Sequence, residues 1–368
     1  MTGFTGHRLR RCRDLWGACR LVEAPPAARV LEDVLLVPPG GPVPAGLFAA
    51  GRRLRGEGGE AAPGALPVGE PAPDGLYLFV PALAPHYGHF VTDTLAHLWP
   101  LAAWEGPRPR LALLAPPHAL DGADYARVIL ERLGLGPGDL VHFDRPVRLP
   151  RLLLPEPAFE ERAFVHAVYG ALCREIGRPF RDGPALDRPV YLTKTRLPAG
   201  IARIANEEAI VEELDRRGVE IVAPETLPFV EQVRLVSTRR VVMGSTGSAF
   251  HTTIFAAPGR RVLGLNWTWK LHANFALLDA VTGTAGRYYF PLGTRYGAAD
   301  SFHFGWQVRD PRAVAAELLA RAEAFDRLDA IDAADDAADR TLLGRVRGLV
   351  EDLRWRLSRG GRGVAGGP

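Results

Sequence analysis

One segment of the sequence combines histidine and aspartate side chains at helical spacing. In PHYGHFVTDTLAHLWPL (residues 85–101), His86 and His89 lie in a glycine-containing turn. If a helix begins near His89, then Asp93 and His97 follow at successive four-residue steps on the same face. An imidazole and a carboxylate in this arrangement could act as a general base and its orienting partner, which deprotonation of a hydroxyl group requires. For His97, packing in a core is the preferred interpretation.

Zinc binding is a competing interpretation of this segment, because closely spaced histidines resemble a metal-binding pair. The glutamate of an HExxH motif is absent, however, and the sequence offers no evident third ligand. We therefore expect no resident metal, and base chemistry at His89 and Asp93 is the favoured hypothesis.

A second segment is a hydroxyl-rich turn between a predicted strand and a predicted helix. Its residues are Gly244, Ser245, Thr246, Gly247 and Ser248. Glycines let backbone N–H groups approach a ligand closely, hydroxyls add donors, and a helix N-terminus offers unpaired amides, a combination that favours a phosphate. The turn is neither a GxGxxG fingerprint nor a Walker loop. The residue types are equally compatible with simple capping of the helix by Ser245, Thr246 and Ser248.

Cationic side chains follow the predicted strand over 188–196. Thr193, Lys194 and Arg196 leave this strand at its C-terminal end, and Arg203 precedes the next predicted helix. Cations at such a place can neutralise a diphosphate leaving group, which is the main electrostatic demand of sugar transfer from a nucleotide. A solvated surface loop is the alternative. The surface-loop alternative applies more to the arginines than to Lys194, because the chain has many arginines and only two lysines.

Two further polar residues stand near the ends of predicted elements. Asn206 lies at the start of a predicted helix, and Glu225 follows a predicted strand. Glu225 could accept hydrogen bonds from ribose hydroxyls or cap the helix that follows it, and the sequence does not separate these two roles.

Short aliphatic or β-branched runs alternate with amphipathic segments along the chain. In the second half, strands are predicted over 188–196, 219–224, 240–245 and 260–266, helices over 206–218 and 228–239, and a loop and helix over 246–259. In the first half, strands are predicted over 75–83, 110–116, 140–154 and within 27–60, and helices over 89–104, 124–134 and 161–176. Alternation with short connections indicates parallel sheets covered on both faces.

The expected fold is therefore α/β, with two Rossmann-like lobes facing each other across a cleft. A Pro- and Gly-rich break near residues 178–189 divides the lobes. The predicted parts are a lobe over 1–185, a lobe over 186–311, helices over 312–357 that dock back on a lobe, and a flexible tail over 358–368. Ligands of such sheets bind beyond the carboxyl ends of the strands. The loops that carry the candidate site residues follow these strand ends.

Composition excludes several classes of protein. Of 368 residues, 45 are basic and 42 acidic, a net charge of +3, which gives nucleic-acid binding no support. The three cysteines form neither a disulfide framework nor a paired zinc motif, which favours a reducing cytoplasm. No apolar run has the length of a signal peptide or a bilayer span. An apolar stripe over 342–357 is expected to dock on a lobe, and contact with the inner face of a membrane is the minority alternative.

The segments, in this order, resemble glycosyltransferase family 61, once called DUF563, which includes bacterial capsular-polysaccharide transferases. HYGHFVTDTLAHLW is similar to the family block in which a histidine and a following acidic residue open a helix, with His89 and Asp93 at the matching positions. The later family blocks read YLTK, RIANEE, ETLPFVEQ, GSTGSAF and PGRRVLGL here. The resemblance covers roughly residues 85–105 and 188–292, and the five later blocks, taken in order, are more specific than any one of them.

The sequence departs from the family pattern at two positions. Thr246 stands where the family has a histidine, and Lys194, a point charge, stands where a planar arginine is more usual. The histidine would be a donor near the nucleotide phosphates, so its replacement points to an altered donor preference or to lost activity.

The resemblance implies a GT-B fold and inverting transfer from a nucleotide-sugar donor to a glycan or lipid-linked glycan acceptor, in surface polysaccharide synthesis, without an obligatory metal. It implies Asp93 or His89 as the base. The implied donor-binding residues are Lys194, Arg203, Asn206, Glu225, Ser245, Thr246, Gly247 and Ser248. Two alternatives stay open: a sugar-nucleotide epimerase, and a non-catalytic glycan- or nucleotide-binding protein of the same fold.

Overall fold

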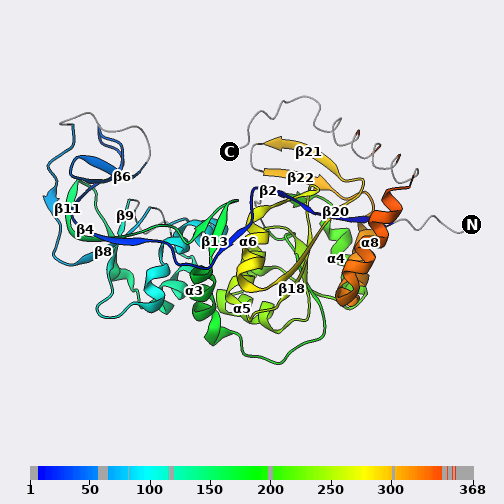
Figure 1. The fold of residues 1–368 in the computed structure, drawn as a ribbon. Coiled ribbons are helices and arrows are strands. Elements are labelled where there is room, and N and C mark those ends of the chain that lie inside the picture. The colour runs from blue at the N-terminus through cyan, green and yellow to red at the C-terminus, as the bar shows by residue number, and fades with distance from the viewer. Residues whose placement is uncertain are drawn as a thin grey trace, which may run out of the picture. The chain divides into compact units, whose positions relative to one another are not determined.

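The computed structural model of the chain describes residues 7–56, 65–81, 83–114, 116, 120–197, 202–300, 303–341, 346, 350 and 353. Strands and helices divide between two compact units, which are described separately below (Figure 1). Unit 1 comprises the chain up to Ala18, Arg181–Leu227 and the chain from Glu231 onward. Unit 2 comprises Cys19–Phe180 and the short segment Pro228–Val230.

Unit 1 is built on a six-stranded sheet. Its strands, in spatial order, are β1 (Leu9–Arg11), β20 (Ala285–Pro291), β18 (Arg261–Leu265), β17 (Val242–Ser245), β14 (Val190–Leu192) and β16 (Glu220–Val222). All neighbours are parallel except β1, which runs antiparallel to β20. Numbered along the chain, the five parallel strands lie in the order 2-1-3-4-5, which is a doubly wound arrangement. The expectation of a parallel α/β sheet in this half of the chain is confirmed.

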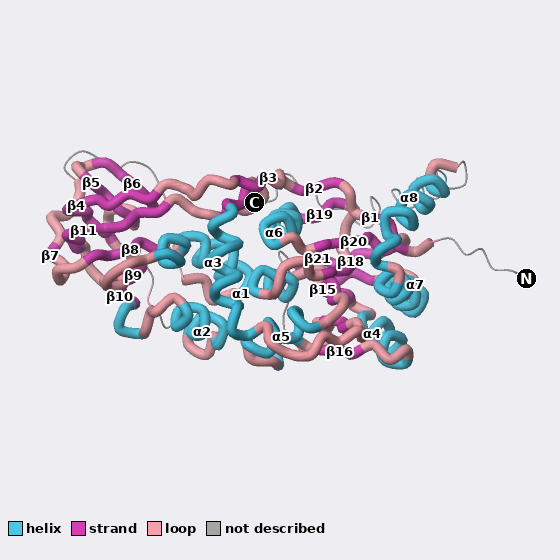
Figure 2. The backbone as a smooth tube through the Cα atoms, turned by 60° about the horizontal axis from the view of Figure 1, so that its bottom comes forward, coloured by secondary structure: helices cyan, strands magenta, loops and turns pink. Residues whose placement is uncertain are grey.

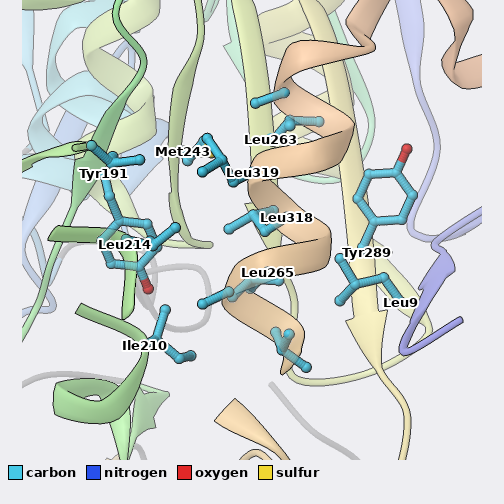
Figure 3. Packing of buried hydrophobic residues seen from close by; sticks show 14 of the residues in the cluster. Leu9, Tyr191, Ile210, Leu214, Met243, Leu263, Leu265, Tyr289, Leu318 and Leu319 are labelled. Carbon is cyan, nitrogen blue, oxygen red and sulfur yellow. The ribbon is translucent and has the colours of Figure 1, made fainter. Parts of the chain in front are cut away.

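Helices follow the strands of unit 1, most of them at the predicted places, whereas the helix Ala273–Thr282 was not predicted from the sequence. They are α4 (Glu207–Arg216), α5 (Phe229–Thr238), the 3-10 helix η8 (Ser248–Phe255), α6 (Ala273–Thr282), α7 (Pro311–Glu323) and α8 (Leu328–Asp339). Side chains from the sheet and from the helices form one apolar cluster, to which α4 contributes Leu214, α7 contributes Leu318 and β18 contributes Leu263 (Figure 3). Burial of these side chains is the main stabilising contribution of the layer.

Two small sheets complete unit 1. β2 (Asp14–Trp16) pairs with β19 (Lys270–His272), and β15 (Arg203–Ile204) pairs with β22 (His303–Gln307), which pairs with β21 (Arg295–Asp300). The N-terminal strands therefore join the C-terminal half of the chain, whereas the sequence grouped them with residues 19–185. The physical reason is long-range pairing: β1 adds to the free edge of β20, and the Glu317 carboxylate of α7 accepts hydrogen bonds from the backbone N–H groups of Arg8 and Leu9.

The C-terminal helices were expected to dock back on a lobe, and α7 and α8 do pack on unit 1 (Figure 2). Of the apolar stripe over 342–357, the structure describes Val346, Val350 and Leu353, and all three are exposed. The tail over 358–368 lies outside the described residues. No helix in the part of the chain that the structure describes is long and apolar enough to cross a membrane.

Unit 2 contains a mixed sheet of eight strands. Their spatial order is β10 (Leu140–His142), β9 (Arg110–Leu113), β8 (Leu76–Val80), β11 (Val147–Pro155), β4 (Ala28–Val37), β5 (Gly46–Ala49) and β6 (Arg52–Gly56), with β7 (Glu70–Pro71) also paired to β11. β8 to β11 are parallel and lie in the order 3-2-1-4, whereas β4, β5 and β6 are antiparallel. The order of the parallel strands reverses between β8 and β11, so their carboxyl ends form the switch point of this sheet.

Two predicted helices of unit 2 need correction. The segment 89–104 is not one α-helix but a series of short turns: α1 (Tyr87–His89), a π-helix η1 (Phe90–Thr94) and the 3-10 helices η2 (Leu95–His97) and η3 (Trp99–Ala103). Pro100 has no N–H to continue the helical ladder, and the Tyr169 hydroxyl donates to the Val91 carbonyl within the π-helix. π-Turns of this kind are frequent at functional sites.

The predicted helix over 161–176 begins later, as α3 (Ala167–Gly177). Residues before it form a hairpin of β12 (Phe159–Glu160) and β13 (Phe164–His166), and β13 also pairs with β3 (Arg20–Val22). Pairing with β3 supplies hydrogen bonds that residues 164–166 would otherwise have made in a helix. The remaining helix, α2 (Asp124–Arg132), lies within its predicted range.

Candidate active site

The cationic and hydroxyl-rich segments of unit 1 meet at the switch point of its sheet. β14 and β17 are parallel neighbours, and the strand order reverses between them. Lys194 follows the end of β14, and Thr246 and Gly247 follow the end of β17. Open α/β sheets bind ligands at this place, because the loops after the two strands diverge there.

The Lys194 ammonium lies against the backbone of the turn. Its Nζ atom donates to the Thr246 carbonyl at 2.6 Å. A Cβ atom at Gly247 would lie 2.6 Å from the same Nζ, so glycine leaves the space that the ammonium occupies. Burial lowers the pKa of Lys194 to about 8, opposed by the nearby Glu207 carboxylate. The ammonium is thus partly desolvated and makes one neutral hydrogen bond, and an anion at this place would stabilise its charge.

Glu207, the first residue of α4, fixes the backbone that carries Lys194. Its carboxylate accepts a hydrogen bond from the Lys194 backbone N–H at 3.1 Å and another from the Tyr191 hydroxyl at 2.9 Å. Both Glu207 and Tyr191 are buried. The loop after β14 is therefore held in place by side chains that the sequence did not single out.

The hydroxyls of the turn do not cap the helix η8, which has no side-chain cap. The Thr246 hydroxyl donates to the Asn266 side-chain carbonyl at 2.8 Å instead. Within the described structure the Ser245 hydroxyl makes no hydrogen bond, although the residue is only 5% exposed. The capping interpretation is wrong for these two residues.

Three other expected donor residues lie elsewhere in unit 1. The Asn206 amide exchanges two hydrogen bonds with the Val308 backbone, at 2.8 and 3.0 Å. The Arg203 guanidinium donates to the Leu197 carbonyl at 2.8 Å, which braces the loop after Lys194. Glu225 is exposed in the 3-10 turn η7 (Pro224–Thr226). The structure thus gives Asn206 and Arg203 structural contacts, and their roles toward a nucleotide stay predictions.

Unit 2 has a cavity of about 830 Å³ at the switch point of its own sheet. The segment after β8 contributes Thr92, Asp93 and His97 to the cavity wall. The segment after β11 contributes Glu156 and Glu161. The other lining residues are Pro26, Ala27, Arg55, Pro157, Phe159, Glu160, Arg162, Phe164 and His166. This volume is typical of small-molecule sites.

The predicted pair of His89 and Asp93 is formed at the edge of this cavity. The His89 Nδ1 atom lies 3.3 Å from an Asp93 carboxylate oxygen, and both side chains are about half exposed. The Thr92 hydroxyl donates to Glu161 at 3.0 Å and lies 3.3 Å from the other Asp93 oxygen. Burial raises the pKa of Asp93, the Glu161 carboxylate raises it further, and His89 and Thr92 lower it. A raised pKa suits a carboxylate that takes a proton from a hydroxyl group.

The same cluster is the one group, among the described residues, whose atoms could hold a metal ion. Ligand atoms of His89, Asp93 and Glu161 lie within 4.8 Å of one another. One imidazole and two carboxylates are a plausible donor set for a divalent cation. The sequence missed this third ligand, because Glu161 lies in a hairpin remote from the histidine segment along the chain.

His97 lies on the cavity wall, whereas the sequence favoured a core position. Its Nδ1 atom is 2.9 Å from the Asp93 carbonyl, so Nδ1 carries the proton and Nε2 is the acceptor. Burial lowers the pKa of His97, which keeps its imidazole neutral. The signal that could have found His97, Glu156 and Glu161 is their position after the two strands that flank the switch point.

Open, mostly parallel α/β sheets that bind nucleotides do so at the switch point, where the Lys194 ammonium lies in unit 1. The family model described as Glycosyltransferase 61 matches residues 87–263, from α1 to β18. Residues 87–263 of the chain are therefore similar to glycosyltransferase family 61, which confirms the resemblance, and the match suggests a glycosyltransferase activity. A search of curated proteins found no match to the chain.

Proposed function

We propose that the protein is an inverting glycosyltransferase of the GT-B type, in which unit 1 binds the nucleotide-sugar and unit 2 supplies the catalytic base. One observation carries the proposal: the Lys194 ammonium is held at the switch point of unit 1, against the Thr246 carbonyl and beside Gly247. This arrangement suits a diphosphate, which needs a cation, backbone amides and hydroxyl donors.

The proposed reaction is a single in-line displacement. The Asp93 carboxylate takes the proton of an acceptor hydroxyl, whose oxygen forms a bond to the anomeric carbon. The bond from that carbon to the nucleoside diphosphate breaks, and the diphosphate leaves with the electron pair. His89 orients Asp93 through the contact at 3.3 Å, and Lys194 stabilises the charge of the leaving group.

The first test is the substitution Asp93→Asn, with Asp144→Asn, an exposed residue of unit 2, as the matched control. We expect Asp93→Asn to lower sugar transfer by about 10²- to 10⁴-fold, because the base is removed, while the dissociation constant of UDP or GDP stays within about twofold. Turnover and calorimetric titration measure the two quantities. Retained turnover in Asp93→Asn would remove Asp93 from the mechanism.

A non-catalytic binding protein is the second candidate, favoured by one observation. Thr246 replaces the family histidine, and its hydroxyl is engaged by Asn266. Nucleotide binding without transfer or donor hydrolysis would support this candidate. An isomerised sugar nucleotide formed without acceptor would indicate an epimerase.

The proposed reaction needs no resident metal, since Lys194 takes the charge of the diphosphate. Turnover that survives EDTA and does not rise with added Mn²⁺ is the expected result. We predict a glycan or lipid-linked glycan acceptor, a role in surface polysaccharide synthesis, and a cytoplasmic location with or without contact to a membrane. Transfer assays with candidate acceptors and cell fractionation would test these predictions.

A further inference from the structure

We propose that the cavity of unit 2 is the acceptor site and that it selects a saccharide without negative charge. Acceptors with a carboxylate or phosphate next to the reacting hydroxyl would be rejected. This inference rests on the proposed function, because it assumes that Asp93 at the cavity edge deprotonates the acceptor.

The charges of the cavity wall carry the argument. Its carboxylates are Asp93, Glu156, Glu160 and Glu161, and its guanidinium groups are those of Arg55 and Arg162. These four carboxylates and two guanidinium groups carry a formal net charge of −2. A concave surface with an excess of one sign focuses its potential, so an anion entering the cavity meets repulsion.

The distribution of these charges strengthens the effect near the reacting atoms. Arg55 forms an ion pair with Glu156, so these two side chains neutralise each other. The carboxylates of Asp93 and Glu161 lie close together, with the Thr92 hydroxyl in contact with both. An acceptor carboxylate beside Asp93 would therefore approach two negative groups at once, and like charges at close range oppose binding.

The remaining lining groups suit a sugar. Carboxylates accept hydrogen bonds from sugar hydroxyls without needing a countercharge. The neutral His97 adds an acceptor nitrogen, because its Nδ1 is bound to the Asp93 carbonyl. Pro26, Pro157 and Phe164 add apolar surface for the C–H faces of a ring. A ligand that matches these lining groups carries both hydroxyl donors and apolar ring faces, and a saccharide has both.

The test compares matched pairs of sugars on the full chain. Methyl glycosides of glucose, galactose and mannose are each paired with the uronoside that carries a carboxylate at C6. Binding is followed by saturation-transfer NMR and competition titration at about pH 8, where imidazoles are mainly neutral, with EDTA and low salt. We expect at least one neutral glycoside to bind at least about tenfold more tightly than its uronoside.

Two variants that each remove one negative charge test whether the cavity wall causes the discrimination against acidic sugars. Glu160 is exposed on the cavity wall, and Glu105 is exposed outside it. We expect Glu160→Gln to reduce the discrimination between neutral and acidic sugars about two- to threefold, whereas Glu105→Gln leaves it unchanged. Equal effects of the two variants would show that overall charge, not the cavity, discriminates, and would overturn the proposal.

Other results also overturn the inference. Tighter binding of the uronosides, or no binding of any of the sugars up to their solubility limits, excludes the cavity as a site for uncharged saccharides. Titration with UDP and a donor-hydrolysis assay separate this failure from failure of the proposed function. If UDP binds and the donor is hydrolysed, only the acceptor inference falls; if neither occurs, the glycosyltransferase proposal falls.

Discussion

The Lys194 ammonium lies directly against Gly247, where only a residue without a side chain leaves room for it. The ammonium is buried enough that its pKa falls to about 8, and it occupies the space that a Cβ atom at Gly247 would need. A partly desolvated ammonium that, among the described residues, donates to one neutral carbonyl costs stability, so a compensating anion is expected. Functional sites commonly keep such unfavourable groups.

The substitution Gly247→Ala tests this pair. The new Cβ would meet Lys194 Nζ at 2.6 Å and push the ammonium away from the turn. We expect UDP affinity to fall at least about tenfold with little change in thermal stability, because the displaced atom is the end of a flexible side chain. Calorimetric titration and thermal unfolding measure the two effects. Gly305→Ala, whose Cβ would make an ordinary contact at 3.6 Å, is the control. Equal UDP affinity in both variants would contradict the proposed phosphate site.

Asp93 and Glu161 provide a prediction on pH dependence. The base acts when it is deprotonated, so kcat/KM should fall as pH falls through the pKa of Asp93. Glu161 raises that pKa, while His89 and Thr92 lower it. Removing the Glu161 charge should therefore move the acid limb of the pH profile to lower pH.

The variant for this experiment is Glu161→Gln, which keeps an oxygen acceptor for the Thr92 hydroxyl. The shift is read from kcat/KM measured across the acid range, with the alkaline limb as an internal reference. A merely structural role for Glu161 would lower the rate at every pH and leave the limb in place, and that outcome would contradict the prediction.

Among the elements, α6 and β20 enclose a carboxyl group that plays no part in the proposed mechanism. Asp279 of α6 accepts a hydrogen bond from the Tyr288 hydroxyl of β20 at 3.0 Å. Burial raises the pKa of Asp279 from 3.8 to about 8. The folded state therefore holds a proton that the unfolded state releases above about pH 4.

This contact predicts how stability depends on pH. Because the folded pKa is raised, the contribution of Asp279 is fully present below about pH 4 and is lost as pH rises to about 8. Asp279→Asn, which keeps an acceptor for Tyr288, should make the urea unfolding midpoint less dependent on pH in this window. The exposed control Asp144→Asn should leave the slope unchanged. A wild-type slope retained in Asp279→Asn would show that other groups dominate.

At the scale of the whole molecule, a buried charge network connects the two ends of the chain within unit 1. Arg321 of α7 is 4% exposed and contacts Asp332 at 2.9 Å, Glu317 at 2.8 Å and the Leu9 carbonyl at 3.3 Å. Arg11 of β1 contacts the same Asp332, which is 2% exposed, at 2.8 Å. The network fixes β1 and α8 to α7 (Figure 2).

Removal of the central cation should destabilise unit 1. Arg321→Met leaves the buried Asp332 without its closest α7 partner, and we expect a loss of about 3–5 kcal/mol in the free energy of unfolding. Arg312→Met on the same helix is the control. Its pair with Glu212 is exposed on both sides, so the expected loss is below about 1 kcal/mol. Urea denaturation measures both losses, and equal losses would contradict a stabilising role for the buried network.

The amino-acid sequence by itself determined the alternation of strands and helices from β14 to β18 and the pairing of His89 with Asp93. Both depend on spacing along a few residues, since hydrophobic periodicity and the helical repeat are local properties. For the same reason, local spacing alone places the turn at Gly247 and the cation at Lys194 directly after strand ends.

Only the tertiary structure decided which distant segments share a site. Glu161 joins Asp93 because β8 and β11 are neighbours in the sheet, and β1 joins unit 1 because the edge of β20 accepts it. Asn206 is used by the Val308 backbone, about one hundred residues along the chain. Strand order and long-range hydrogen bonds depend on how elements pack, and local spacing carries no information on that packing.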